Sequence, residues 1–361
     1  MVRDDRSRQI PERMPKGWVP PVPAWATQLP EGNSLTIAYY GVQTETGHEV
    51  GQVDGFRSWI LALLEQGDGP IHVEFAEFVD AFGYYTWLCI GYWTDSDAHG
   101  RWVASPRHQE YWLSKERLQG HVGVFRETLS IPGERFETIQ SDATHRAGSA
   151  NACPALQGPI RAHNYWGSMR DRLALSAHET MDSRFEQLPD DGSSKCSRGR
   201  RISVNPPANL AVIRSGQAFG ELQGREKEIY FSEIEPALRA GMDYLRDHPE
   251  EAGCYSCRLL RETDAHGHQL SRSFGLAHFA SLKHLESWAS GHPTHLRIFN
   301  SFLSMATELG TSLKLVLWHE VAVLPAHGQC FEYLNCHPGT GLLPHVEQQQ
   351  SSNNHDSGVQ V

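Results

Sequence analysis

The first half of the chain alternates between segments with strand periodicity and segments with helix periodicity. SLTIAYYGV, from Ser34, is typical of a strand, and FRSWILALLEQ, from Phe56, carries apolar residues at helical spacing. Residues 71–93 then predict a β-hairpin with its turn near 80–83. A second helix containing Trp102 and a last strand, GVFRETLSI, complete the series.

The second half repeats this order of elements. It begins with the strand NLAVIRSG, continues with an amphipathic helix and a hairpin over 254–279, and ends with a helix containing Trp288 and the strand LKLVLWHEVAVL. LCIGYW at position 88 aligns with FGLAHF at position 274, an offset of 186, and the same offset relates Trp102 to Trp288. The chain is therefore expected to contain an internal repeat.

A strand, helix, hairpin, helix and strand form the split-βαβ unit of ferredoxin-like folds. We therefore predict an α+β protein made of two tandem ferredoxin-like repeats of the dimeric α+β-barrel type. Two sheets should face each other with the helices outside, and a cofactor could lie between a sheet and a helix. The predicted divisions are an extended N-terminal arm at 1–32, a first half at 33–180, a polar loop at 181–207, a second half at 208–345 and a disordered tail at 346–361.

Composition limits the possible partners. The net charge of −11 argues against nucleic acid or an anionic membrane as the main partner, and no apolar run approaches the roughly 20 residues that a membrane helix needs. The N-terminus lacks the apolar segment of a secretory signal, and seven cysteines, an odd number, fit a reduced cytoplasmic protein. Cys254 and Cys257 form a C-x-x-C pair, for which a small apolar role in a strand is preferred over zinc.

Two histidines are candidate metal ligands at equivalent places in the repeat. Pro293 suits the first turn of a helix, and His295 then shares an apolar stripe with Phe299 and Phe302, as a haem ligand requires. On spacing alone, a hydrogen-bonded core histidine is the favoured interpretation. His108, preceded by its own proline, aligns with His295 at an offset of 187. The repeat therefore offers two candidates and does not choose between them.

His319 interrupts the apolar face of the predicted strand LKLVLWHEVAVL. Its counterpart in the first repeat is Arg126, so the fold does not demand a histidine at this place. A buried imidazole serves either structure or function, and the pattern leaves both open. Ser215 is a plausible hydroxyl donor, but no G-x-S-x-G motif marks it as a nucleophile. Arg170, Arg172 and Glu137 carry no periodic signal, and the absence of C-x-x-C-H argues against covalent haem attachment.

Longer motifs resemble the aldoxime dehydratase family, which includes phenylacetaldoxime and aliphatic aldoxime dehydratases. The similarity runs from PPVPAW to CHPGTGLLP, over most of the chain. It rests on GYW at 91, RFET at 135, YWGSMRDR at 165, AVIRSGQ at 211, HPTHLRIF at 292, WHEVAVL at 318 and NCHPGTG at 335. The resemblance implies a fold like that of chlorite dismutases and dye-decolourising peroxidases, a homodimer, and dehydration of R–CH=N–OH to R–C≡N on a ferrous b-type haem.

The resemblance also implies roles for individual residues. His295 would be the axial ligand of the haem iron, and His319 the distal acid and base. Ser215 would hydrogen-bond the oxime oxygen, while Arg172 and Glu137 would complete the distal network. Arg170 is then structural. Some members carry Met where this chain has Ala24 in the N-terminal arm, which would make room for a bulkier substrate if that residue lines the pocket.

Three alternatives remain at the level of sequence. A haem sensor or carrier of the same fold would have no dehydratase activity, and a peroxidase or dismutase relative would work from ferric haem. A haem-free ferredoxin-like interaction module would bind no cofactor.

Overall fold

The computed structural model describes residues 8–27, 29, 32–45, 50–188 and 197–346. The first half contains the predicted series of elements, and both sides of the hairpin turn at 80–83 lie where the pattern places them. Its elements are β2 (Ser34–Glu45), α1 (Val50–Leu64), β3 (His72–Val79), β4 (Tyr84–Trp93), α2 (Ser96–Ala104), α3 (Pro106–Leu113) and β5 (Gly123–Pro132).

The second half follows the same order, with its first helix lengthened by a π-helical turn at Tyr230–Ile234 between α5 and α6. Its elements are β9 (Ala211–Ala218), α5 (Gly224–Ile229), α6 (Glu235–Asp247), α7 (Pro249–Ala252), β10 (Cys254–Thr263), β11 (Gln269–Phe279), α8 (Leu282–Gly291), α9 (Pro293–Leu309) and β12 (Val316–Val323). Among the described residues, no helix has the length and hydropathy needed to cross a membrane.

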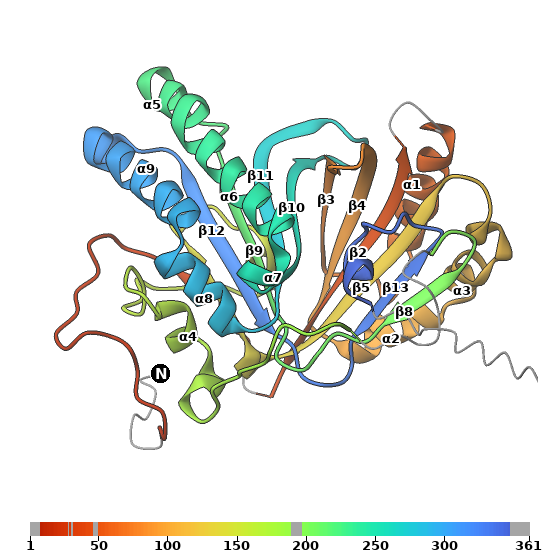
Figure 1. The fold of residues 1–361 in the computed structure, drawn as a ribbon, viewed down its shortest axis with the longest axis horizontal. Coiled ribbons are helices and arrows are strands. Elements are labelled where there is room, and N and C mark those ends of the chain that lie inside the picture. Colours follow the sequence, from red (N-terminus) through yellow and green to blue (C-terminus); the bar gives the residue numbers. More distant parts are fainter. Residues whose placement is uncertain (1–7, 28, 30–31, 46–49, 189–196, 347–361) are drawn as a thin grey trace, which may run out of the picture.

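The strands of the two halves form one curled antiparallel sheet. Each half has the strand order last, first, third, second, namely β5–β2–β4–β3 and β12–β9–β11–β10. The prediction of two separate facing sheets is therefore wrong, because β3 and β10 pair over Glu77↔Arg261 to Phe75↔Thr263 and join the halves. Figure 1 shows the helices of the second half at one end of this curled sheet and α1–α3 at the other.

The strand that follows each half in sequence pairs with the last strand of the other half. β6 (Phe136–Gln140) follows the first half in sequence, but it pairs with β12 of the second half. β13 (Cys330–Leu334) follows the second half and pairs with β5 of the first. β8 (Arg201–Val204) pairs with β13, so part of the predicted loop at 181–207 is a strand. Residues 189–196 of that loop, and 347–361 of the predicted tail, lie outside the described residues.

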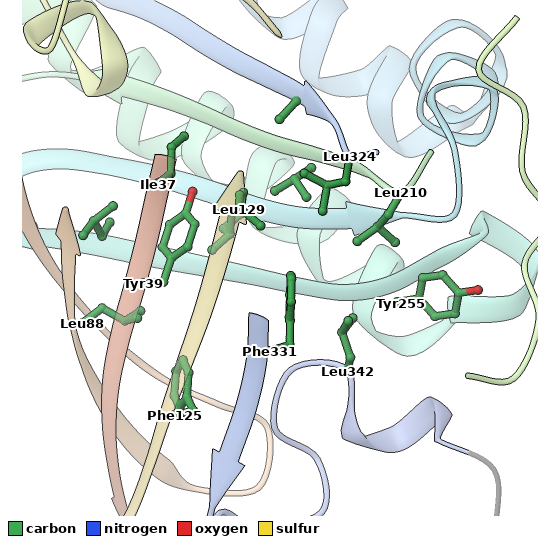
Figure 2. Packing of buried hydrophobic residues seen from close by; sticks show 14 of the residues in the cluster. Ile37, Tyr39, Leu88, Phe125, Leu129, Leu210, Tyr255, Leu324, Phe331 and Leu342 are labelled. Atoms are coloured by element: carbon green, nitrogen blue, oxygen red, sulfur yellow. The ribbon is translucent and has the colours of Figure 1, made fainter. Parts of the chain in front are cut away.

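The inner face of the curled sheet forms a core shared by both halves. Figure 2 shows side chains from both halves meeting there. The labelled members are Ile37, Tyr39, Leu88, Phe125, Leu129, Leu210, Tyr255, Leu324, Phe331 and Leu342. Because this core contains side chains from both halves, unfolding one half would expose apolar surface of the other.

The N-terminal arm ends in β1 (Ala26–Thr27), which pairs with β7 (Leu156–Gln157) in a separate two-stranded sheet. The described arm residues before β1 contain no helix. Ala24 is buried, and its carbonyl accepts a hydrogen bond from the backbone of Ile160. The segment after β7 leads to the short helix α4 (Ser168–Arg172).

Candidate active site

An uncovered patch lies on the outer face of the second half, where β9 and β12 run side by side. The antiparallel register places Ser215 directly opposite His319 on one side and Gly275 on the other. Ser215 is exposed although its strand has neighbours on both sides, and the His319 side chain is 21% exposed. Two polar groups therefore reach an accessible surface in the middle of a sheet.

The equivalent patch of the first half is filled by side chains. Tyr40 occupies the place of Ser215, between Arg126 on β5 and Cys89 on β4. The Tyr40 ring lies within 6.4 Å of four other rings, those of Trp59, Trp102, His108 and Trp112. Replacing a tyrosine by a serine, and a cysteine by a glycine, removes the volume that closes this face, so the second half has room that the first lacks.

His319, Glu137 and Arg172 form a connected cluster beside Ser215. Nε2 of His319 lies 2.9 Å from Glu137 Oε1 and 2.8 Å from Arg172 Nη2. Arg172 Nε donates to Glu137 Oε2 at 2.6 Å. The Glu137 and Arg172 side chains are 1% and 7% exposed. The three groups thus form a buried ionic cluster whose outermost member is the imidazole.

The electrostatics of the cluster favour an ionised Glu137. Burial alone would raise the pKa of this carboxyl, but the charges of Arg172 and His319 and their hydrogen bonds outweigh burial and hold the pKa below its ordinary value. The Glu137 carboxylate, 2.9 Å from Nε2, can accept a hydrogen bond from Nε2–H and so stabilise an imidazolium. Among the described residues, no group hydrogen-bonds Nδ1 of His319, which leaves this atom for a ligand.

Pairing between distant strands brings the cluster together. Glu137 lies on β6 opposite Val321, next to the pair Ile139↔His319. Arg172 ends the short helix α4, and its Nη1 donates to the Ala162 carbonyl at 2.7 Å. Periodicity does not mark Glu137, because β6 follows the first half in sequence but pairs with the second half in space.

The structure separates the two arginines of SMRDR. Arg170 points away from the cluster and forms a bidentate ion pair with Glu286 on α8, at 3.0 and 2.8 Å. Its Nη1 also donates to the Thr180 carbonyl. Arg172, two residues on, contacts Glu137 and His319 instead. Arg170 therefore fastens α4 to α8, whereas Arg172 faces the patch.

His295 lies in the first turn of α9, which Pro293 begins and the His292 side chain caps. Its ring packs edge-on to Trp288 at 4.7 Å, with Trp166 at 6.3 Å. Burial lowers its pKa, which favours the neutral, ligating form of imidazole. Nδ1 is buried without a hydrogen bond of normal geometry, although the Ala289 carbonyl is close enough to oppose part of the pKa decrease.

Helix α9 is poorly covered for its composition. Of its seventeen residues, all of them described, Met305 alone is fully buried. Leu296, Phe299 and Phe302 are only partly buried, although they are large and apolar. An apolar helix face that protein side chains leave half covered, next to an imidazole with a free nitrogen, fits a large flat cofactor such as haem.

His108 lacks these properties. Its side chain is completely buried, and Nε2 is 3.0 Å from the hydroxyl of Tyr40. Burial lowers its pKa to about 3, so it is a neutral core residue. The repeat offered His108 and His295 as equals, but the structure buries His108 completely and leaves His295 only half-buried.

The environment of Cys254 and Cys257 does not support a zinc site. Cys254 and Cys257 are buried, and burial raises the pKa of Cys254 to about 12. His337, which follows Cys336 and could act as a further ligand, is instead held by Asp80 at 2.6 Å. Within the described part of the chain, no three histidine, cysteine or acidic side chains are grouped to hold a metal ion.

Sequence reasoning missed Trp166. Its side chain is 50% exposed, and its ring lies near both His295 and Phe299. It belongs to the motif YWGSMRDR, which also carries Arg172. A large aromatic residue within a motif that otherwise supplies site residues was the available signal.

Comparison with known proteins places the chain in a family. A family model described as haem-containing dehydratase matches residues 38–342. The aliphatic aldoxime dehydratase of Rhodococcus globerulus is 37% identical over 337 residues, covering 93% of this chain and 94% of that protein. The phenylacetaldoxime dehydratase of a Bacillus species is 32% identical, covering 93% and 95%.

A solved aldoxime dehydratase in complex with butyraldoxime superimposes with a TM-score of 0.87 at 35% identity, covering 95% of this chain and 94% of that one. A second crystal structure of an aldoxime dehydratase gives the same TM-score and identity. The family model covers most of the chain, and the named relatives match nearly their whole length. This chain belongs to the haem-containing dehydratase family.

Proposed function

We propose that this protein dehydrates aldoximes to nitriles, converting R–CH=N–OH to R–C≡N and water on a ferrous b-type haem. The observation that carries the proposal is the ionic cluster of His319, Glu137 and Arg172 beside Ser215, on a patch that protein side chains leave open. Relatives with 32–37% identity bear the names of enzymes for this reaction.

The haem would lie between the β9–β12 face and α9. His295 would hold the haem iron, because its ring packs against Trp288 and no hydrogen bond of normal geometry engages its Nδ1 within the described residues. When bound, the ferrous haem supplies a coordination site for the oxime nitrogen and electron density that weakens the N–O bond. Trp166 and Phe299 would pack beside it.

The distal residues supply the proton movements. Hydroxide is a poor leaving group, so the imidazolium of His319 donates a proton to the oxime hydroxyl, which departs as water. The neutral imidazole then takes the proton from the oxime carbon, which restores the imidazolium and completes the nitrile. Ser215, directly across from His319, hydrogen-bonds the oxime oxygen and fixes its position.

Glu137 and Arg172 prepare His319 for both steps. The Glu137 carboxylate faces Nε2 and stabilises the imidazolium. Arg172 keeps Glu137 ionised despite its burial, and its second nitrogen faces the same Nε2. Both described hydrogen bonds of His319 involve Nε2, which leaves Nδ1 to exchange the proton with the substrate.

We further propose a cytoplasmic homodimer whose halves are tandem ferredoxin-like units. The shared strand order of the halves supports the repeat, and six cysteines without disulfides among the described residues support a reducing compartment. The dimer rests on the family resemblance, and sedimentation of the haem-loaded protein tests it.

The experiment is anaerobic. Dithionite-reduced protein should shift its Soret band on addition of phenylacetaldoxime, and phenylacetonitrile should accumulate. His319→Ala should keep haem and the spectral shift but lose most turnover. A band that does not respond, or a response without nitrile, would leave a haem sensor or carrier. Turnover that requires ferric haem and peroxide would favour a peroxidase-like enzyme.

A further inference from the structure

The N-terminal arm is fastened to the segment that carries Arg172. The backbone amides of Gln9 and Ile10 both donate to the Ala177 carbonyl at 2.9 Å. Trp18 Nε1 donates to the His163 carbonyl at 3.0 Å, and the Trp18 and Tyr165 rings meet edge to face. Arm residues 8–18 therefore hold this segment at points on both sides of α4.

Asp171 is the point where the arm meets α4 itself. It is 2% exposed, and both of its carboxylate oxygens accept from the backbone N–H of Arg13, at 3.1 and 2.9 Å. The Tyr165 hydroxyl donates to the same carboxylate at 2.8 Å. The Arg13 side chain lies over Gly167, at φ +97°, where any larger residue would collide with it.

Arg172 needs such support because its helix is short. Five residues form little more than one turn, and an isolated helix of that length is unstable in water. Within α4 the preceding residue, Asp171, is tied to the arm, while Arg170 is tied to Glu286 on α8. The orientation of the Arg172 guanidinium is thus set by contacts outside the cluster that it serves.

We propose that Asp171 is a positioning residue of the distal site, through which arm residues 8–18 hold Arg172 against Glu137 and His319. This inference rests on the proposed function, because it assigns the arm to the same site. It predicts that loosening Asp171 displaces Arg172 while haem stays bound, since His295 lies on a different element, α9.

Matched variants separate the backbone contact from the side chain. Arg13→Ala keeps the N–H that Asp171 accepts but loses the ion pair with Glu286 and the side-chain packing over Gly167, whereas Arg13→Pro removes the N–H as well. Asp171→Asn replaces one acceptor by a donor. We expect Arg13→Pro and Asp171→Asn to lower kcat about tenfold or more, because small displacements of a catalytic group are costly. KM and haem content should stay at their wild-type values. Lys16→Ala, exposed on the same arm, is the control.

A second background tests whether Asp171 acts through Arg172. In Arg172→Ala, adding Asp171→Asn should not lower kcat further, because the positioned group is already gone. An additive loss, or full kcat in haem-loaded Asp171→Asn, would overturn the proposal.

A spectroscopic readout avoids turnover altogether. The C–O stretching frequency of the ferrous CO complex responds to positive charge on the distal side, so Asp171→Asn should shift it in the same direction as Arg172→Ala. An unchanged frequency would refute the positioning role. If the frequency shifts but the wild-type protein makes no nitrile, the dehydratase proposal fails and the arm contact stands.

Discussion

Removing His295 and removing His108 should have opposite consequences, although the two residues occupy equivalent places in the repeat. His295→Ala removes a half-buried imidazole from a partly covered helix. His108→Ala removes one that fills the centre of an aromatic cluster and bonds to Tyr40. We expect the first variant to lose haem and keep its fold, and the second to keep haem and lose stability.

The cost of His108→Ala follows from its surroundings. The substitution leaves the buried Tyr40 hydroxyl without its 3.0 Å partner and opens a cavity against Trp59, Trp102 and Trp112. The Tyr40 hydroxyl keeps its contact with Arg126. The lost hydrogen bond and the cavity together lower the free energy of unfolding by about 3–5 kcal/mol. Haem per folded chain should remain at the wild-type level.

His108 also makes the free energy of unfolding depend on pH. The pKa of His108 in the folded chain is about 3, below its ordinary 6.5. Between these two values the imidazole is protonated in the unfolded chain and neutral in the folded chain. The stability from the neutral imidazole is complete above 6.5 and declines as pH falls, by about 1.4 kcal/mol per pH unit until the folded pKa is reached. The difference between wild type and His108→Ala should therefore shrink between pH 7 and pH 5.

Two assays check the pair. Pyridine haemochrome measurement gives haem per chain, and urea unfolding of the haem-free forms, followed by tryptophan fluorescence, gives stability without the added contribution of cofactor binding. Added imidazole should restore haem binding to His295→Gly. If His295→Ala retains full haem, or if folded His108→Ala loses it, the assignment of the ligand from accessibility is wrong.

Further predictions concern the distal residues. Arg172→Ala should lower kcat about a hundredfold at constant haem, by misplacing the acid and base. Arg170→Ala should mainly lower the melting temperature, because the half-buried Glu286 carboxylate then keeps only its ion pair with the exposed Arg13 side chain among its two arginine partners. Glu137→Gln should remove the acid limb of the kcat/KM profile. In the wild type the pKa of Glu137 is held below its ordinary 4.5. The contribution of its carboxylate to the free energy of unfolding is therefore complete above that value and is lost as pH falls through the lower folded pKa. Ser215→Ala should lower kcat about tenfold in nitrile assays with haem content unchanged, through loss of one hydrogen bond to the oxime oxygen; an unchanged kcat would exclude that bond.

The sequence predicted most of the local structure. The turn near 80–83 lies between the observed strands, β10 and β11 form the hairpin predicted over 254–279, and α9 begins at Pro293 as expected. These features depend on side-chain periodicity and turn chemistry within about twenty residues, which the sequence displays directly. The family motifs also indicated a haem-containing dehydratase, which the comparisons confirm. The roles of His295, His319, Ser215, Arg172 and Glu137 stay predictions.

Tertiary structure decided where these pieces meet. The prediction of two sheets failed because nothing in β3 or β10 alone shows that their edges pair. Glu137 reaches His319 only because β6 crosses to the other half.

The choice between His108 and His295 depended on volume. Both follow a proline at the start of a helix, so local pattern treats them alike. Tyr40 and its neighbouring rings close the space over the first-half sheet, whereas Ser215 leaves it open in the second half. Local sequence thus determined which helices and strands form, because periodicity acts over short distances, while packing between distant side chains decided which histidine has room for a ligand.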